Sequence, residues 1–433
     1  MAAIDVSTNK RIPQLMQLMQ SVPNVRDPHD MVRNFVNELN RVYGDRAYIQ
    51  ISTRGLAKGE YQVQRVLSEK GVELIDRGVN RRTMPISRGG VLGEVTSGAM
   101  PKMLHHVDLS NEPLLDGKLG PYRSLIAVPV LHNEFAIDWV GLLQTNGEGF
   151  TEQDLEDLIM RANLVSALAS NLITQNKLEL ANARIAAEMQ QIARIQRALL
   201  PDVLPDIPGV QLATSYSTFD VVGGDLYDFT ALHRNGSGDQ RWALLIGDVS
   251  GHGPAAAVVM AMFHAILHTY PLNPHGPSEV LRHVNRHLYS KNVENSFVTA
   301  FLGFYEPRSR ELVYARAGHN PPILKDFPHC GDAMLLDAVG EVPLGIVEDV
   351  KYSESSVMLH PGQTLILYTD GITEAKRPGG EMFGVEGIER SLIHCSGAPE
   401  CAISHISDAL KGHQMEVRPN DDQTVVVMQV LKD

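Results

Sequence analysis

The chain has 433 residues, of which 43% are hydrophobic and 21% charged, and its formal net charge at pH 7 is −13. This composition is that of a globular protein, and the length predicts about two or three domains. The negative charge argues against a nucleic-acid-binding protein, because a phosphate backbone needs a basic face, and against binding to an anionic membrane surface.

The sequence predicts neither a secretion signal nor a membrane span. Residues 1–11 lack the apolar core of a signal peptide, and no segment approaches the roughly 18 consecutive apolar residues of a transmembrane helix. Cys330, Cys395 and Cys401 form neither an even disulfide framework nor a CxxC motif. We therefore expect a cytoplasmic protein that begins with a separate terminal segment over residues 1–22.

Residues 23–173 have a mixed α/β pattern. Apolar residues at helical spacing lie at Met31, Phe35, Val36 and Leu39, and Thr151 is a predicted N-cap because acidic residues follow it. Between these two points, four runs have the alternating or continuous β-prone character of strands. These runs are residues 48–52, 61–67, 124–131 and 139–144.

Four segments of this region resemble a GAF domain in their order and spacing. They are Gly-Val-Leu-Gly-Glu-Val at 90–95, residues 124–130, Gly-Leu-Leu at 141–143 and Phe-Thr-x-x-Asp-Leu at 150–155. The resemblance implies an antiparallel-sheet sensor module over residues 23–173, which binds a small ligand or only dimerises. No cysteine is placed for a chromophore and no cyclic-nucleotide signature is present. The ligand is therefore unknown, and a structural GAF domain without a ligand is an equal alternative.

Residues 154–200 contain no proline or glycine and are rich in strong helix formers. Four apolar residues recur at seven-residue intervals, namely Leu178, Ile185, Ile192 and Leu199. This pattern fits one long helix packed on its own domains, or a parallel coiled coil that joins two sensors to two effectors. We favour the coiled coil, as a linker over residues 174–205 in a homodimer, although Glu188 interrupts its second line.

Residues 206–433 are β-rich, with two predicted helices over residues 254–270 and 277–288. Four short acidic motifs occur here, and most of them end or begin a β-prone run. They are Val222-Gly223-Gly224-Asp225, Gly247-Asp248-Val249-Ser250-Gly251-His252-Gly253, Tyr368-Thr369-Asp370-Gly371 and Asp421-Asp422-Gln423-Thr424. A single such motif is commonly only a turn. Together, the four carboxylates predict a shared site for Mg²⁺ or Mn²⁺, and hence a hydrolase that acts on phosphate.

These motifs resemble, in order, the SpoIIE/RsbU branch of the metal-dependent (PPM, type 2C) protein phosphatases. Three further segments share the resemblance, which covers residues 196–431: Gln-Arg-Ala-Leu-Leu-Pro at 196–201, Ala-Gly-His-Asn-Pro-Pro at 317–322 and Pro-Leu-Gly at 343–345. It implies an α-β-β-α sandwich over residues 206–433 that holds two Mn²⁺ or Mg²⁺ ions. The substrates it implies are phosphoserine or phosphothreonine proteins, typically small STAS-domain anti-anti-sigma factors.

The same resemblance implies roles for individual residues. Asp248 would bridge both cations, with Asp225 and the main-chain carbonyl of Val249 around one of them. Asp370 and Asp421 would hold the other, and Asp421 is preferred to Asp422 because that second position is often Asn in the wider family. A water bridging the ions would attack phosphorus in line and displace serine.

Two departures from the family pattern leave two roles open. No arginine stands near Asp225, where many relatives hold the phosphate, and His252 lies further along the chain from Asp248 than the family's catalytic histidine. We keep His252 as a candidate for proton transfer, although a loop histidine is more often an ordinary polar residue. His319 is expected to be structural.

The sequence thus predicts an α+β multidomain enzyme of bacterial signalling, in which a GAF-like sensor regulates a serine/threonine phosphatase through a helical linker. The main alternative is a degenerate phosphatase that acts as a ligand-responsive partner-binding or dimerisation module. The presence of all four carboxylates argues against that alternative. A small-molecule phosphatase or nucleotide hydrolase is less favoured, because no P-loop is present.

Overall fold

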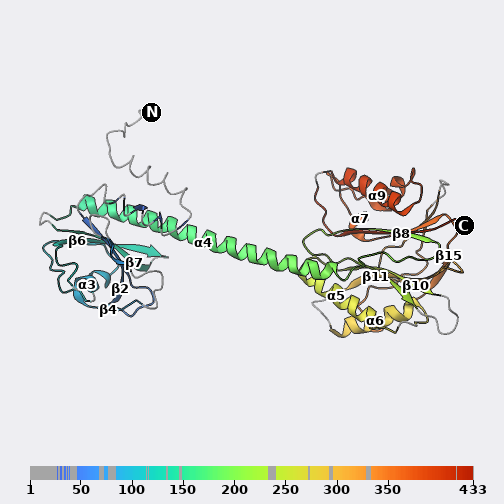
Figure 1. Cartoon of the computed structure of the whole chain (residues 1–433), viewed down its shortest axis with the longest axis horizontal. Helices are drawn as coiled ribbons and strands as arrows, with labels where there is room; N and C mark the ends of the chain where they lie inside the picture. Colours follow the sequence, from blue (N-terminus) through green and yellow to red (C-terminus); the bar gives the residue numbers. More distant parts are fainter. Residues whose placement is uncertain are drawn as a thin grey trace, which may run out of the picture. The chain divides into compact units, whose positions relative to one another are not determined.

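In the computed structural model, the predicted elements form two compact units, Met1–Asn182 and Ala183–Asp433, and helix α4 (Glu152–Arg197) runs from the first into the second (Figure 1). The predicted segment 1–22, Val36 and Cys330 lie outside the residues that the structure describes. The described residues are 27, 30, 31, 34, 35, 37, 39, 46–67, 73–76, 84–113, 115, 117–132, 135–145, 149–232, 240–271, 274–291, 296–327, 333–415 and 417–432.

The N-terminal unit contains an antiparallel sheet with the strand order β3-β2-β1-β7-β6-β5, to which β4 is added beside β2. All four predicted strands are present, and each is longer than predicted. Strands β3, β4 and β5 are too short to show an alternating pattern of apolar residues in the sequence, so they could not be predicted. The strands are β1 (Arg46–Ser52), β2 (Glu60–Leu67), β3 (Glu73–Asp76), β4 (Ser87–Arg88), β5 (Lys102–Leu104), β6 (Ser124–His132) and β7 (Phe135–Gln144).

The two faces of this sheet bury two different apolar clusters, because successive side chains of a strand point to opposite faces. In β1, Ile49 and Ile51 pack in the cluster that includes helix α3 (Gly90–Thr96). Tyr48, which directly precedes Ile49, packs in the cluster that includes Leu158 of α4. The first turns of α4 thus belong to the core of the N-terminal unit.

Helix α4 begins where the sequence predicts, and Thr151 is confirmed as its N-cap. The backbone N–H of Asp154 donates to Thr151 Oγ1 at 3.2 Å, and Asp154 Oδ2 accepts in return from the Thr151 backbone N–H at 2.9 Å. This reciprocal pair is a capping box with aspartate in the third helical position, and it satisfies two backbone donors that the helix itself leaves free.

Replacing this cap gives a first testable result. Thr151→Ala should cost about 1 kcal/mol of stability in the first turn of α4, because the Asp154 N–H loses its acceptor. Thr151→Ser retains the hydroxyl and should behave like the wild type. Hydrogen exchange of the amides in the first turn measures the difference, and equal protection in all three proteins would contradict this role for the hydroxyl.

The C-terminal unit contains two antiparallel sheets of five strands each. Their orders are β15-β12-β11-β10-β9 and β14-β13-β16-β17-β8. The first consists of β9 (Leu226–Leu232), β10 (Arg241–Val249), β11 (Val298–Glu306), β12 (Glu311–Ala317) and β15 (Ser355–Met358). The second consists of β8 (Val210–Ser217), β13 (Ile323–Asp326), β14 (Met334–Leu335), β16 (Gln363–Tyr368) and β17 (Gln423–Val430).

Helices cover the outer faces of both sheets, which gives the expected α-β-β-α layers (Figure 1). Helices α5 (Pro254–His268) and α6 (Pro277–Lys291) pack on the first sheet, and both were predicted. The prediction of only two helices in this region is wrong, because α7 (Asp370–Thr373), α8 (Gly384–Ser391) and α9 (Pro399–Gln414) are also present. In α9 the buried residues Ala402, Ile406 and Leu410 recur every fourth position, a helical spacing that the prediction overlooked.

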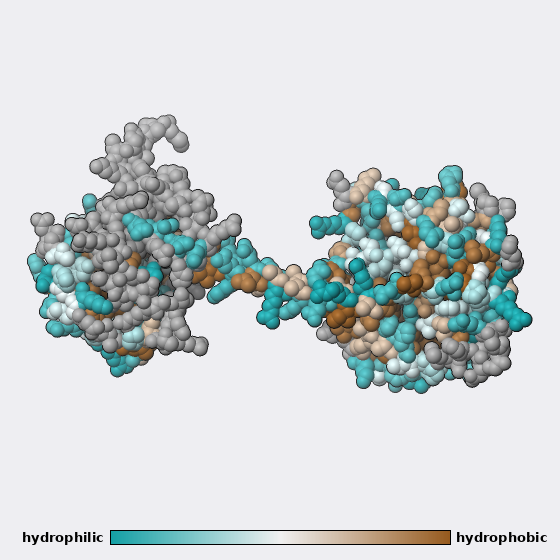
Figure 2. Space-filling view, viewed as in Figure 1, coloured by the Kyte–Doolittle hydropathy of each residue, from teal (hydrophilic) through white to brown (hydrophobic). Residues whose placement is uncertain are grey.

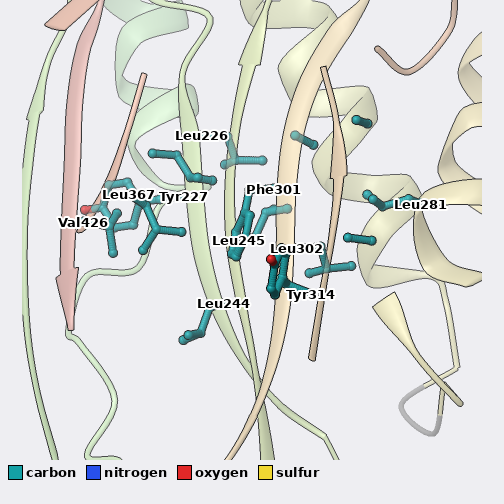
Figure 3. Close-up of a cluster of buried hydrophobic side chains, with 14 of the residues drawn as sticks. Leu226, Tyr227, Leu244, Leu245, Leu281, Phe301, Leu302, Tyr314, Leu367 and Val426 are labelled. Carbon is teal, nitrogen blue, oxygen red and sulfur yellow. The ribbon is translucent and has the colours of Figure 1, made fainter. Parts of the chain in front are cut away.

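The main core of this unit includes the space between the sheets. Figure 3 shows Tyr227 beside Leu367 and Val426, which are cross-strand partners in β16 and β17. On the other face of the first sheet, Leu302 and Leu281 belong to the same buried cluster. Burial on both faces explains why β10 and β17 appear in the sequence as nearly continuous apolar runs.

The part of α4 between the two cores exposes large apolar side chains. Leu178 is 60% exposed, Leu180 73% and Ile185 54%, and Figure 2 shows apolar residues among hydrophilic ones along this part of the helix. Leu199, the last member of the predicted seam, lies beyond the end of α4 and packs against the core of the C-terminal unit. An apolar seam along α4 therefore ends before Leu199.

Candidate active site

The four predicted carboxylates lie at the ends of central strands. Asp225 directly precedes β9, and Asp248 is the penultimate residue of its neighbour β10. Asp370 follows β16 after one residue, and Asp421 precedes its neighbour β17 by two positions. Each sheet thus contributes two carboxylates from paired strands.

Two threonines join the sheets at these strand ends. The Thr369 hydroxyl donates to Asp225 Oδ2 at 2.8 Å, and the Thr424 hydroxyl donates to the same oxygen at 2.5 Å. Both threonines belong to the second sheet's motifs, whereas Asp225 belongs to the first sheet. These two bonds bring the Val-Gly-Gly-Asp loop beside Asp370 and Asp421.

The carboxylates concentrate negative charge in a buried place. Burial, followed by the charges of Asp225, Asp370 and Asp421, raises the pKa of Asp248 far above its usual range. Burial also raises the pKa of Asp225, with a further contribution from the charge of Asp422. Burial and the charge of Asp421 raise the pKa of Asp370 to about 6. Such a group of carboxylates favours protons or cations among its oxygens.

The oxygen atoms present fit a hard divalent cation. Asp225 Oδ1 is buried and receives no hydrogen bond from any described donor, so it has an open lone pair for a cation. A Cβ at Gly224 would lie 2.8 Å from the main-chain oxygen of Val249 and 3.4 Å from Asp248 Oδ1. Glycine therefore leaves room beside those two oxygens. Carboxylate and carbonyl oxygens together are the ligands that Mg²⁺ and Mn²⁺ prefer.

The adjacent residues Asp421 and Asp422 have different environments. Asp422 is 2% exposed, and its two carboxylate oxygens accept from the backbone N–H groups of Phe219 at 2.7 Å and Gly224 at 2.5 Å. It therefore anchors the loop before β9. Asp421 is partly exposed, and its charge acts on both Asp248 and Asp370. This difference favours Asp421 as the cation ligand.

The two histidines of the motifs also differ. His252 is exposed, and its ring contacts that of Phe219 with the centroids 5.6 Å apart. His319 is buried, and Thr299 Oγ1 lies 2.9 Å from its Nδ1. Burial and the charge of Arg316 lower the pKa of His319 to about 3, so its ring is neutral at pH 7. That environment suits the structural role expected for His319.

Sequence reasoning missed the residues that position the carboxylates. The Gln196 side chain donates to the Gly223 carbonyl at 2.5 Å and accepts from the Gly223 N–H at 3.1 Å. It joins the last turn of α4 to the loop that carries Asp225. Gln196, Thr369, Asp422 and Thr424 all lie inside the motifs quoted above, so their positions were available but their contacts were not.

A second prediction concerns the Thr424 hydroxyl. Thr424→Val keeps the shape of the side chain but leaves Asp225 Oδ2 with one hydroxyl donor instead of two. We expect the affinity for Mn²⁺ to fall about 10-fold, as for other residues that orient a ligand, and calorimetric titration measures it. Thr269→Val, at the exposed end of α5, is the matched control. Unchanged affinity in Thr424→Val would show that this bond does not position Asp225 for a cation.

Comparison with known proteins identifies the C-terminal domain. Residues 238–431 match the sequence model of the family described as Stage II sporulation protein E (SpoIIE). The C-terminal half of the chain carries a SpoIIE-family, PP2C-type phosphatase domain. The SiaA-PP2C domain of Pseudomonas aeruginosa superimposes with a TM-score of 0.50 at 23% identity, covering 58% of this chain and 98% of that domain. This likeness shows the PP2C fold.

Two curated relatives extend the comparison. The phosphoserine phosphatase RsbU of Bacillus subtilis is 29% identical over 249 residues, which are 56% of this chain and 70% of RsbU. Protein IcfG of Synechocystis is 26% identical over 373 residues, which are 78% of this chain but only 54% of IcfG. The chain thus spans about half the length of IcfG. In the part of the chain that the structure describes, no helix is both long enough and apolar enough to span a membrane.

Proposed function

We propose that the SpoIIE-family domain of this chain hydrolyses phosphoserine or phosphothreonine in a protein, as part of bacterial signalling. The observation that carries this proposal is the buried Asp225 Oδ1, which has no described donor and lies in a group with Asp248, Asp370 and Asp421. RsbU, whose name describes a phosphoserine phosphatase, supports the same reaction.

The proposed ligand set uses oxygens from both sheets. Asp248 would contact two Mg²⁺ or Mn²⁺ ions, Asp225 and the Val249 carbonyl one of them, and Asp370 and Asp421 the other. The ions would supply an activated water and neutralise charge on the phosphoryl group. Thr369 and Thr424 hold Asp225 through Oδ2 and leave Oδ1 free, so the carboxylate has one oriented coordinating oxygen.

Arg197 is our candidate for holding the substrate phosphate, a role left open by the absence of an arginine near Asp225 in sequence. It is exposed at the end of α4, directly after Gln196. Burial and the charges of Asp422 and Asp225 raise the pKa of Tyr216, whereas the charge of Arg197 lowers it. Arg197 therefore lies within electrostatic range of the same tyrosine as two of the motif carboxylates.

The third prediction tests this assignment. Arg197→Ala should raise KM for a phosphoprotein about 10-fold, because a guanidinium–phosphate hydrogen bond contributes roughly 1.5–3 kcal/mol. The control is Arg194→Ala, which removes an exposed arginine from the same turn of α4. Steady-state kinetics separates the two variants. Equal KM values in the wild type and Arg197→Ala would exclude Arg197 as the phosphate ligand.

His252 remains our candidate for protonating the serine that leaves. Its ring is exposed and is supported on one side by Phe219, whose backbone N–H is held by Asp422. It thus stands on the loop that follows β10, where a substrate could reach it. An imidazole ring at this position can serve as a proton donor to the oxygen of the leaving serine.

The proposal includes regulation by the N-terminal unit, which we interpret as a GAF-like sensor in a homodimer. Two observations support a route through α4. Its exposed apolar residues Leu178 and Ile185 offer a surface for a second copy of the helix. At its other end, Gln196 is bonded to the loop of Asp225. A change in helix packing could therefore alter the position of a cation ligand.

The substrate we propose is a phosphorylated STAS-domain protein. The test incubates the full chain with phosphorylated STAS proteins from the same organism, with and without Mn²⁺, and measures released phosphate. We expect manganese-dependent release that is absent in Asp248→Asn. Release from a small phosphate ester but from no phosphoprotein would reject the protein substrate. Binding of the phosphoprotein without any release would instead support the degenerate phosphatase.

A further inference from the structure

Three side chains outside the phosphatase site form a second potential ligand group. Asp228 of β9 and His264 and His268 of α5 each offer one ligand atom, and these atoms all lie within 4.8 Å of one another. The two histidines are four residues apart and so share one face of α5, with ring centroids 4.2 Å apart. Asp228 is buried, His264 is half-buried and His268 is exposed.

This group lies on the opposite face of the first sheet from the second sheet. Tyr227 points toward the second sheet, where its hydroxyl accepts from Thr214 Oγ1 of β8 at 3.3 Å. The next residue, Asp228, points the other way and lines a cavity together with Leu267 of α5. The cluster is therefore separate from the carboxylates proposed for phosphate hydrolysis.

We propose that Asp228, His264 and His268 bind a zinc ion. Two imidazoles and one carboxylate are a ligand set that zinc uses when its fourth position is open. Imidazole nitrogens disfavour Mg²⁺, which prefers oxygen ligands only. The site therefore selects a different cation from the one proposed for the phosphatase centre.

The distances require little adjustment. His268 Nε2 lies 2.9 Å from Asp228 Oδ2, whereas ligands of a tetrahedral zinc with bonds of about 2.0 Å lie about 3.3 Å apart. All three ligand atoms lie within 4.8 Å of one another, so no separation exceeds that of tetrahedral zinc ligands by more than about 1.5 Å. Thr230 Oγ1 already donates to Asp228 Oδ2 at 3.0 Å, which orients the carboxylate as outer partners do in metal sites.

A simple ion pair explains only part of the cluster. The hydrogen bond with Asp228 raises the pKa of His268, which fits a paired imidazolium. His264, in contrast, has no hydrogen-bond partner among the described residues, and burial together with the charge of His268 lowers its pKa. A neutral imidazole with a free ring nitrogen is what a metal ligand requires.

The surroundings leave space for a fourth ligand. Asp228, Thr230 and His268 border a cavity of about 40 Å³, whose other walls are mainly apolar. A cavity needs only about 10–15 Å³ of such space to hold one water, so this cavity can hold a water bound to the ion. Zinc at this position would connect β9, which begins after Asp225, to α5, which begins after the loop of Asp248.

The experiment titrates Zn²⁺ into the full chain in saturating Mg²⁺, which keeps the phosphatase carboxylates occupied, and records heat and stoichiometry. We expect one zinc more in the wild type than in His264→Asn or His268→Asn. If a weak site remains in these variants, its affinity for zinc should be at least about 100-fold below that of the wild type. In Thr230→Val the zinc affinity should fall about 10-fold. Co²⁺ in place of Zn²⁺ should give a visible absorption band that both histidine variants lose.

The chain provides a matched control in His283 and His287. These residues are also four apart, on α6, with ring centroids 4.2 Å apart, but no described carboxylate completes a cluster with them. His283→Asn should therefore bind zinc like the wild type. Zinc binding should also persist in Asp248→Asn, which separates this site from the proposed phosphatase activity. Equal zinc stoichiometry and affinity in the wild type and folded His264→Asn, or no zinc in the wild type, would refute the site.

Discussion

Asp248→Asn should abolish manganese-dependent phosphatase activity while leaving the metal-free protein at least as stable as the wild type. In the metal-free protein, burial and three neighbouring carboxylates disfavour the Asp248 charge. A neutral amide of the same shape removes that repulsion, so the melting temperature should stay equal or rise. Losing the proposed bridging ligand should reduce kcat/KM more than about 100-fold, beyond the usual cost of removing an outer-shell partner.

Metal titration makes this prediction sharper. Saturating Mn²⁺ should stabilise the wild type by about 2.7 kcal/mol when its concentration is 100 times Kd, and should not stabilise Asp248→Asn. The control is Asp349→Asn, which changes a carboxylate whose side chain is 86% exposed. Phosphate release and thermal melting should be measured on the same samples. Full activity in Asp248→Asn, or an equal shift in melting temperature with Mn²⁺, would contradict the proposed ligand set.

The sequence predicts well those elements in which the buried positions match the spacing of apolar residues along the chain. The strand that ends near Asp248 is buried on both faces, and the helices that begin at Pro254 and Pro277 each start with a proline. The capping box at Thr151 is a local motif, so three residues suffice to predict it. Helix α9 was missed because polar residues separate Ala402, Ile406 and Leu410, which hides their helical spacing.

The composition of the site follows from motifs, but its internal contacts do not. Asp422 and Gly224 are 198 residues apart in sequence and only 2.5 Å apart in space, between a carboxylate oxygen and a backbone nitrogen. No local pattern distinguishes the anchoring role of Asp422 from the partly exposed position of Asp421. The Asp228–His268 contact is equally hidden, because strand β9 and helix α5 acquire their register only when the first sheet pairs. Tertiary structure supplies this information.

Gln196 belongs to a sequence motif, but its role depends on a contact with Gly223, which is distant in the sequence. Its amide satisfies both backbone groups of Gly223, and Gly223 and Gly224 directly precede Asp225. The side chain of Gln196 is 4% exposed, so water cannot easily replace it. The position of Asp225 is thus set from three directions: by Thr369 and Thr424, by Asp422 through Gly224, and by the end of α4 through Gln196.

Gln196→Ala should therefore reduce kcat/KM about 30-fold in the full chain, with little change in global folding. It leaves the buried N–H and C=O of Gly223 without partners, and each lost partner costs roughly 1–3 kcal/mol in the active arrangement. Gln196→Glu can still accept from the Gly223 N–H but cannot donate to the Gly223 carbonyl. Its activity should therefore lie between those of the wild type and Gln196→Ala. The control Gln190→Ala, on an exposed face of α4, should be fully active.

The same variants test whether α4 carries a signal, because the two roles of Gln196 predict different patterns. If Gln196 only supports the loop, Gln196→Ala should lower the activity of the full chain by the same factor in every state of the N-terminal unit. If it transmits packing of α4, Gln196→Ala should also remove the effect of Glu188→Leu, which is expected to tighten the predicted seam. Activity of the double variant compared with both single variants measures this coupling. Strictly additive effects would mean that the linker acts on Asp225 through another contact.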